Sequence, residues 1–203
     1  MPAADDEAVG FPADATVQTA DGRTRQMDAV AIGDTLCTSP TTTGRVYFWS
    51  HADAAGVHPF VTLTTAAGAA ITLSPGHYLP VVRRNGGGGS PALVTGASVA
   101  VGDTLTLADG TRSAVTATAR VSRRGLYAPH LTGAAGVVAI ANGIWASEMT
   151  TAVAPAVARP ALSVVRAVAA VAGRLGLGGA VRLPSGGGWW TALAPRGEAL
   201  VEQ

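Results

Sequence analysis

The stretch ITLSPGHYLPV, residues 71–81, constrains the fold more than any other part of the chain. Apolar Ile71 and Leu73 alternate with polar neighbours, which is the period of a half-buried strand. Pro75 and Gly76 predict a tight turn, because proline presets φ and glycine tolerates a positive φ. The stretch is therefore predicted to fold as strand, turn and strand, with His77 held just past the turn.

Two interpretations of His77 are consistent with this arrangement. Ser74 lies three residues before His77, so its hydroxyl can orient an imidazole that moves a proton. In the alternative, the stretch is an ordinary hairpin whose histidine covers a sheet edge. The local pattern alone favours the hairpin, and the rest of the chain has to decide between the two.

Composition excludes several classes of protein. Hydrophobic residues make up 48% of the chain and charged residues 13%, which is not the composition of a disordered protein. The net charge of +1 gives no reason to expect a nucleic-acid partner. A single cysteine, Cys37, excludes an internal disulfide and a cysteine-based zinc site. Residues 1–9 lack the apolar run of a secretory signal, so the compartment stays undetermined.

From Gly10 to about residue 150 the pattern indicates a mostly β fold of short strands separated by turns. The apolar residues of this region do not recur with the period of a helix. Strands are expected, among other places, near residues 11–17, 35–37, 46–49, 60–65, 104–107, 113–121 and 136–140.

An internal repeat suggests two similar halves. The sequence AVAIGDTL at residues 29–36 is echoed by SVAVGDTL at residues 98–105. The repeat could simply reflect a good turn-into-strand sequence. We favour a duplicated β subdomain, with halves near residues 15–70 and 85–140 related by a pseudo-two-fold axis.

The composition changes after residue 150. Residues 155–174 are rich in alanine, valine and leucine, and Arg159, Arg166 and Arg174 recur at a spacing that places them on one helix face. This predicts a short amphipathic helix in a C-terminal extension, and the arginines argue against a membrane span.

Several blocks together resemble the Hint domain, and most closely its hedgehog-type branch. They occur in the family's order at residues 10–17, 32–34, 73–79, 125–129 and 142–147. The resemblance implies a Hint domain over residues 10–150, with a flanking segment at 1–9 and a helical extension at 151–203. It also implies a disc-shaped β fold that brings Gly10 and Ser147 close together.

The resemblance implies autoprocessing chemistry, the family activity in hedgehog proteins and inteins. A cysteine at the first position turns the preceding amide into a thioester, which a second nucleophile then cleaves. His77 is similar to the family histidine that activates the amide, and Ser74 stands where the family has threonine. The implied partners are the upstream segment of the chain's own precursor and a sterol or lipid bound by the extension. No cofactor or metal is implied, and a hedgehog-like precursor would pass through the secretory pathway.

The chain departs from the family pattern at the reaction centre. Gly10 stands at the position of the nucleophilic cysteine and has no side chain to attack with. His51 replaces an aspartate that helps to activate the sterol, and Glu148 stands where the family often has cysteine, serine or threonine. Cys37 falls in a predicted strand and is expected to be a small buried residue. The self-cleavage expected of the family is therefore predicted to be blocked or impaired here.

Three hypotheses remain open from the sequence. The chain is an autoprocessing domain with blocked cleavage, or a Hint-fold binding or adaptor module without catalysis. A metal site built from the four histidines is disfavoured, because no pair has the i, i+4 spacing of a helical zinc motif. A thiol restored by Gly10→Cys is expected to separate the first two, since only the first would then cleave. The four histidines are His51, His58, His77 and His130.

Overall fold

The computed structural model describes residues 9–85, 89–132 and 138–147, together with the single positions Ala167 and Val171. The described residues between 9 and 147 form mainly strands, which confirms the predicted mostly β fold. The regular elements besides strands in that part are two 3-10 turns, η1 and η2. In chain order the elements are β1 (Thr16–Gln18), β2 (Thr24–Gln26), η1 (Met27–Ala29), β3 (Thr35–Cys37), β4 (Thr43–Thr65), β5 (Ala70–Leu73), β6 (Tyr78–Val82), β7 (Ala92–Thr95), η2 (Gly96–Ser98), β8 (Thr104–Thr106), β9 (Arg112–Leu131), β10 (Val138–Ala141) and β11 (Ile144–Ala146).

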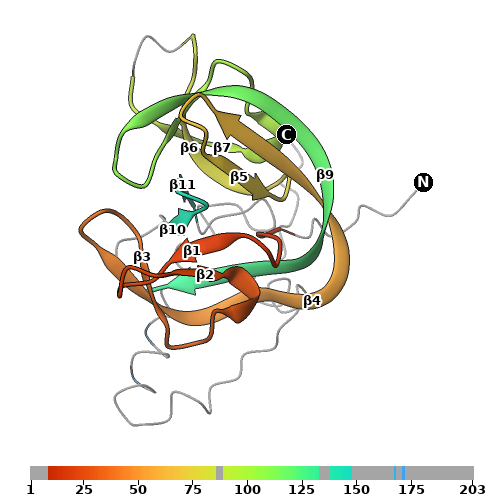
Figure 1. Cartoon of the computed structure of the whole chain (residues 1–203). Helices are drawn as coiled ribbons and strands as arrows, with labels where there is room; N and C mark the ends of the chain where they lie inside the picture. Colours follow the sequence, from red (N-terminus) through yellow and green to blue (C-terminus); the bar gives the residue numbers. More distant parts are fainter. Residues whose placement is uncertain (1–8, 86–88, 133–137, 148–166, 168–170, 172–203) are drawn as a thin grey trace, which may run out of the picture.

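Two long strands, β4 and β9, form the frame of the molecule. They pair antiparallel from Val46 opposite Leu131 to Thr65 opposite Val115. Figure 1 shows them curving side by side from the region of β1–β3 to the region of β5–β7. The separate strands predicted at residues 46–49 and 60–65 are wrong, because both belong to β4. The register of β4 shifts between Asp53 and Val57, and such bulges let one strand bend without ending.

The remaining strands attach to this frame. One described sheet has the order β11-β10-β1-β2, and the other has the order β3-β4-β9-β8-β6-β7 with β5 on β4. β1 pairs with β10, and the Thr16 amide donates a 2.6 Å hydrogen bond to the Asn142 side chain. The beginning and the end of the predicted domain therefore lie side by side.

The stretch at residues 71–81 folds only partly as predicted. Its two strands exist as β5 and β6, and Ile71 and Leu73 are buried as their alternation requires. The predicted hairpin is wrong, because β5 pairs with β4 whereas β6 pairs with β7 and β8. The backbone groups at the turn are used by other segments instead. Ser74 bonds to Gly10, and the Gly96 amide donates to the His77 carbonyl.

The repeated sequence forms the same turn twice. Gly33 and Gly102 both have a positive φ, 100° and 92°, which glycine adopts without strain. The aspartate after each glycine accepts a hydrogen bond from a backbone amide three residues earlier, Ala31 for Asp34 and Ala100 for Asp103. The two copies of the repeated sequence therefore share a local structure. The pseudo-two-fold relation of two whole halves stays a prediction.

One hydrophobic core holds the described strands together. Its largest fully buried side chains include Phe11, Met27, Leu36 and Leu63. All members of this cluster among the described residues lie between Phe11 and Ala146. The helix predicted at residues 155–174 lies outside the described residues, apart from Ala167 and Val171. The described part of the chain contains no helix with the length and apolarity needed to cross a bilayer.

A truncation tests whether the extension contributes to this core. We expect the chain cut after Thr151 to keep its β circular dichroism spectrum and a cooperative thermal transition, because the described core closes with β11. A chain cut after Ile140 serves as the control. It removes Ile144, which is fully buried, and is expected to unfold. Loss of structure in the Thr151 truncation would show that the extension is part of the core.

Candidate functional site at the Val9–Gly10 peptide

The candidate site forms around the turn that joins β5 to β6. The His77 amide donates a 3.1 Å hydrogen bond to the Ser74 carbonyl, which closes the turn over Pro75 and Gly76. Both ends of the turn are buried, with Ser74 0% and His77 1% exposed. A histidine that merely covers a sheet edge would be exposed to water, so that interpretation of His77 is wrong.

Ser74 binds the backbone of Gly10 rather than the ring of His77. The Gly10 amide donates to Ser74 Oγ at 2.9 Å, and the Ser74 amide donates to the Gly10 carbonyl at 2.9 Å. Ser74 Oγ was expected to orient the imidazole. It instead contacts the nitrogen that would leave if the Val9–Gly10 peptide were cleaved. Val9 is itself buried, so this whole peptide lies inside the fold.

The next residue fixes the same segment on β9. Phe11 and Tyr127 exchange two backbone hydrogen bonds, of 2.7 and 2.8 Å. This approach is so close that a Cβ added to Gly10 would lie 2.5 Å from the Tyr127 carbonyl oxygen and 2.9 Å from its carbon. Backbone atoms cannot rotate away as a side chain can. Position 10 therefore accepts glycine alone unless the bridge between Phe11 and Tyr127 moves.

His77 joins the other end of the domain to this site. Its Nε2 lies 2.6 Å from the carbonyl oxygen of Ser147, and its ring lies 4.4 Å from the ring of Phe11. The expected proximity of Gly10 and Ser147 is confirmed, because both bind the 74–77 turn. A carbonyl oxygen only accepts, so Nε2 carries the proton in the neutral ring. Nδ1 then holds a lone pair, and it is buried without a hydrogen-bond partner among the described residues.

The surroundings of His77 keep it neutral. The pKa of His77 is lowered from 6.5 to about 4, because burial, with a smaller effect of the nearby His130, outweighs the bond to the Ser147 carbonyl, which raises the pKa. At neutral pH the ring is thus a buried proton acceptor at Nδ1 and a proton donor at Nε2. It can take up a proton from a nucleophile, and it can protonate a leaving nitrogen once Nδ1 has been protonated.

The other predicted site residues are placed less directly. His51 lies in β4 opposite Ala128, the residue after Tyr127, so it is one strand away from the Phe11 segment. Glu148 lies outside the described residues. Cys37 is in β3, and its Sγ donates to the Thr19 carbonyl at 3.5 Å rather than to any of the site residues above. The prediction that Cys37 is buried is wrong in part, because its side chain is only partly buried.

The four histidines do not assemble a metal site in the described part of the chain. No group of three or more metal-binding side chains occurs there. His58 Nε2 lies 2.8 Å from a carboxylate oxygen of Asp53. The amides of Gly56 and Ala55, followed by His58, hold the pKa of that carboxyl at about 2. This pair spans the register shift of β4 between Asp53 and Val57.

Sequence reasoning missed two contributors to the site, Tyr127 and His130, and it missed the bond between His77 and the Ser147 carbonyl. Tyr127 and Ser147 act through their backbone carbonyls, and a backbone group leaves no signal in the residue type. His130 was considered only as a metal ligand. It is buried, and it stacks on Phe48 with ring centroids 5.4 Å apart. Its place in an apolar run of β9 indicated burial, but nothing in the run pointed to His77.

Comparison with known proteins identifies the family to which this chain belongs. The family profile described as the Hint module matches residues 3–194. This chain belongs to the Hint family. The match includes most of the predicted extension, and the boundary near residue 150 stays a prediction. No curated protein matches the chain in sequence.

Solved intein structures are similar to the fold. The crystal structure of the gp41-1 intein is 18% identical with a TM-score of 0.54, covering 68% of this chain and 96% of that one. The bacterial intein-like domain from Clostridium thermocellum is 17% identical with a TM-score of 0.52, covering 68% and 96%. A DnaB intein from Synechocystis sp. PCC 6803 is 11% identical with a TM-score of 0.54, covering 68% and 97%. At these identities the likeness shows the fold alone, and the family membership rests on the Hint profile.

The low pKa of His77 makes a testable contribution to stability. Between pH 6.5 and 4 the unfolded chain binds a proton at residue 77 that the folded chain does not bind. The stabilisation is thus complete above about pH 6.5 and is lost as the pH falls through 4. We expect the free energy of unfolding, measured with urea, to fall between pH 7 and pH 5 by about 2 kcal/mol more in the parent than in His77→Gln. Glutamine keeps an N–H donor for Ser147 but does not titrate. Equal losses in the two proteins would contradict the buried neutral imidazole.

Proposed function

We propose that this protein is a hedgehog-type Hint domain that holds its own Val9–Gly10 peptide in the processing site but cannot carry out the first acyl shift there. One observation carries the proposal: the Gly10 amide is bound by Ser74 beside a buried His77, and residue 10 has no thiol. The hedgehog branch rests on the sequence blocks and the family membership on the Hint profile.

The chemistry of a Hint site explains why Gly10 is decisive. In the first step a thiolate attacks the carbonyl of Val9, the C–N bond to residue 10 breaks, and the leaving nitrogen takes up a proton. Ser74 Oγ already touches that nitrogen, and His77 is the nearby group able to exchange a proton. These residues support protonation of the leaving group. The attack itself has no nucleophile, because Cys37 belongs to β3 and bonds to Thr19.

The partners follow from the same proposal. The upstream segment would be the acyl part of the reaction, which agrees with the burial of Val9 at the site. His51 lies on β4 near the Phe11 segment and is our candidate for the group that would activate a second nucleophile. Glu148 and a sterol or lipid bound by residues 151–203 complete the hedgehog-type scheme.

A non-catalytic binding or adaptor module is the second candidate, and the glycine-only position favours it. If residue 10 were simply a lost cysteine, space for a side chain would be expected beside it. The 2.5 Å approach to the Tyr127 carbonyl oxygen instead packs the backbone where that side chain would start. The sequence-based expectation that Gly10→Cys restores cleavage therefore requires the Phe11–Tyr127 bridge to open.

Thiol-induced cleavage of a reporter fusion tests the proposal. With dithiothreitol we expect no cleavage at Val9–Gly10 in the parent or in Gly10→Ala, since neither can form a thioester. Gly10→Cys is expected to cleave slowly, because its Cβ displaces the bridge. Adding His77→Ala should lower that rate about a hundredfold or more, and Ser74→Ala should lower it less. The products are measured by gel electrophoresis and mass spectrometry.

Gly10→Ala is the matched control for the added Cβ. Both substitutions at residue 10 are expected to cost about 1–3 kcal/mol of unfolding free energy, a typical cost of overpacking. Cleavage of the parent would overturn the proposed block. A folded but inert Gly10→Cys would support the non-catalytic module.

A further inference from the structure

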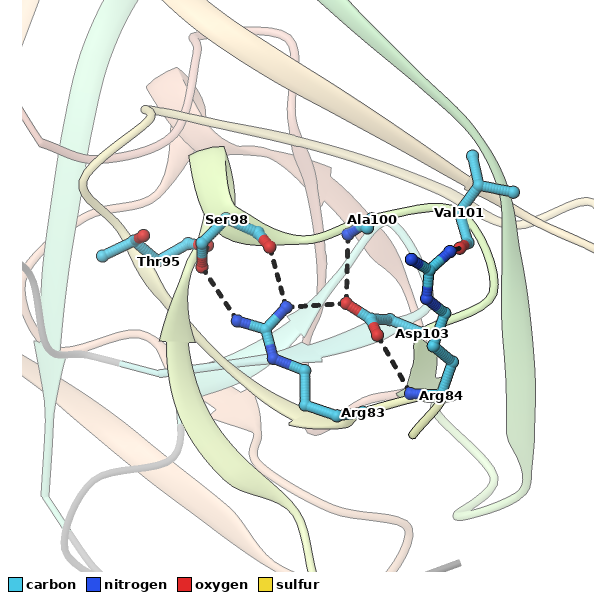
Figure 2. Close-up of polar contacts among 7 residues, drawn as sticks. All are labelled: Arg83, Arg84, Thr95, Ser98, Ala100, Val101 and Asp103. Carbon is cyan, nitrogen blue, oxygen red and sulfur yellow. Dashed lines mark hydrogen bonds and ion pairs between the residues drawn. The ribbon is translucent and has the colours of Figure 1, made fainter. Parts of the chain in front are cut away.

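A buried carboxylate, that of Asp103, lies outside the candidate site, between η2 and β8. This carboxylate is 2% exposed and accepts hydrogen bonds from Arg83 Nη1 at 2.7 Å, from the Ala100 amide at 3.0 Å and from the Arg84 amide at 3.1 Å. Figure 2 shows these bonds converging on the two oxygens. A buried carboxylate is tolerated only when it is paired and hydrogen-bonded in this way.

Asp103 is ionised at neutral pH. Burial acts to raise its pKa, but the amides of Ala100 and Arg84 and the guanidinium of Arg83 together hold the pKa below its ordinary value. The side chain of Arg83 is 40% exposed, so it reaches inward from the surface to meet the carboxylate. The pair ties the end of β6 to the turn that leads into β8.

Arg83 binds η2 as well as Asp103. Its Nη1 donates to the Ser98 carbonyl at 2.7 Å, and its Nη2 donates to Ser98 Oγ at 3.2 Å. Ser98 Oγ in turn donates to the Thr95 carbonyl at 2.8 Å. One guanidinium therefore holds the last residue of η2 and the buried carboxylate at once, as Figure 2 shows. A planar fork of donors suits this task better than an ammonium group.

The other end of η2 lies directly on the 74–77 turn. The Gly96 amide donates to the His77 carbonyl at 2.8 Å, and the Ala97 amide donates to the Pro75 carbonyl at 2.9 Å. A Cβ on Gly96 would lie 2.9 Å from Leu73 Cδ1 and 3.3 Å from the Ser74 carbonyl oxygen. Because η2 fits so closely, a shift of η2 is passed to the backbone that carries His77.

We propose that Asp103 and Arg83 are positioning residues for His77, holding η2 against the 74–77 turn so that the imidazole stays buried on the Ser147 carbonyl. The proposal rests on the proposed function only in treating this turn as the processing site. Among the described residues, neither side chain forms a hydrogen bond with the Val9–Gly10 peptide. Their effect passes through Ser98, Gly96 and Ala97 to the carbonyls of the turn.

The internal repeat supplies a matched control. Asp34 occupies the equivalent turn, accepts from the Ala31 amide and pairs with an arginine, Arg25. Neither Asp34 nor Arg25 has a described hydrogen bond to the 74–77 turn or to η2. Asp34→Asn therefore removes the same kind of turn contact without acting on His77.

The test measures His77 itself by NMR of the imidazole nitrogens in the full chain, with unfolding free energies measured in parallel. In Asp103→Asn we expect the pKa of His77 to rise by about one unit or more and the Nε2–H tautomer signature to become averaged, because a loosened turn admits water to the ring. In Asp34→Asn the pKa of His77 and its tautomer signature should both match those of the parent. Arg83→Lys keeps a cation beside Asp103 but loses the fork to Ser98, so it should shift His77 in the same direction.

The outcomes separate positioning from general stability. An unchanged His77 in folded Asp103→Asn or Arg83→Lys would overturn the proposal. An equal shift in Asp34→Asn would also overturn it, since any loosening of a turn would then suffice. If Asp103→Asn fails to fold, Arg83→Lys decides the question. No step of this test requires cleavage, so cleavage of the parent under dithiothreitol would overturn the proposed function while leaving this result standing.

Discussion

The antiparallel pairing of β4 with β9 is the constraint on which the other contacts depend. It joins residues far apart in sequence, from Val46 opposite Leu131 to Thr65 opposite Val115. β3 and β5 add to β4, whereas β8 and the Phe11 segment add to β9. Ordering so long a pair costs much conformational entropy, which the shared hydrophobic core has to offset. The site exists because this frame places Tyr127 beside the start of the domain.

The candidate site consists largely of backbone groups held at short distances. The Gly10 amide, the Tyr127 carbonyl and the Ser147 carbonyl come from three separate segments, and only Ser74 and His77 contribute side-chain atoms to the hydrogen bonds described for the site. Backbone contacts tolerate changes of side chain well, except where a Cβ has no room. A Hint fold can therefore persist with glycine at residue 10, the position that we propose for the family nucleophile.

The sequence could predict what depends on neighbours along the chain. The alternation of Ile71 and Leu73 predicted a half-buried strand, and the repeated Gly-Asp turn predicted two similar local structures. The predictions failed where partners came from far away. The 71–81 hairpin did not form, because Gly10 and Gly96 take the backbone groups of the turn. Ser74 binds Gly10 instead of the ring of His77 for the same reason.

The sequence by itself determined the mostly β class, the turn before His77, the absence of a thiol at residue 10 and, through its blocks, the Hint family. These properties follow from residue type and short-range periodicity. Only the tertiary structure decided that position 10 has no room for a Cβ, that His77 is neutral and bound to Ser147, and that Asp103 is linked to the turn of His77 through Arg83 and η2. Steric exclusion and desolvation depend on atoms brought together from distant segments, and one segment's sequence does not encode which atoms those are.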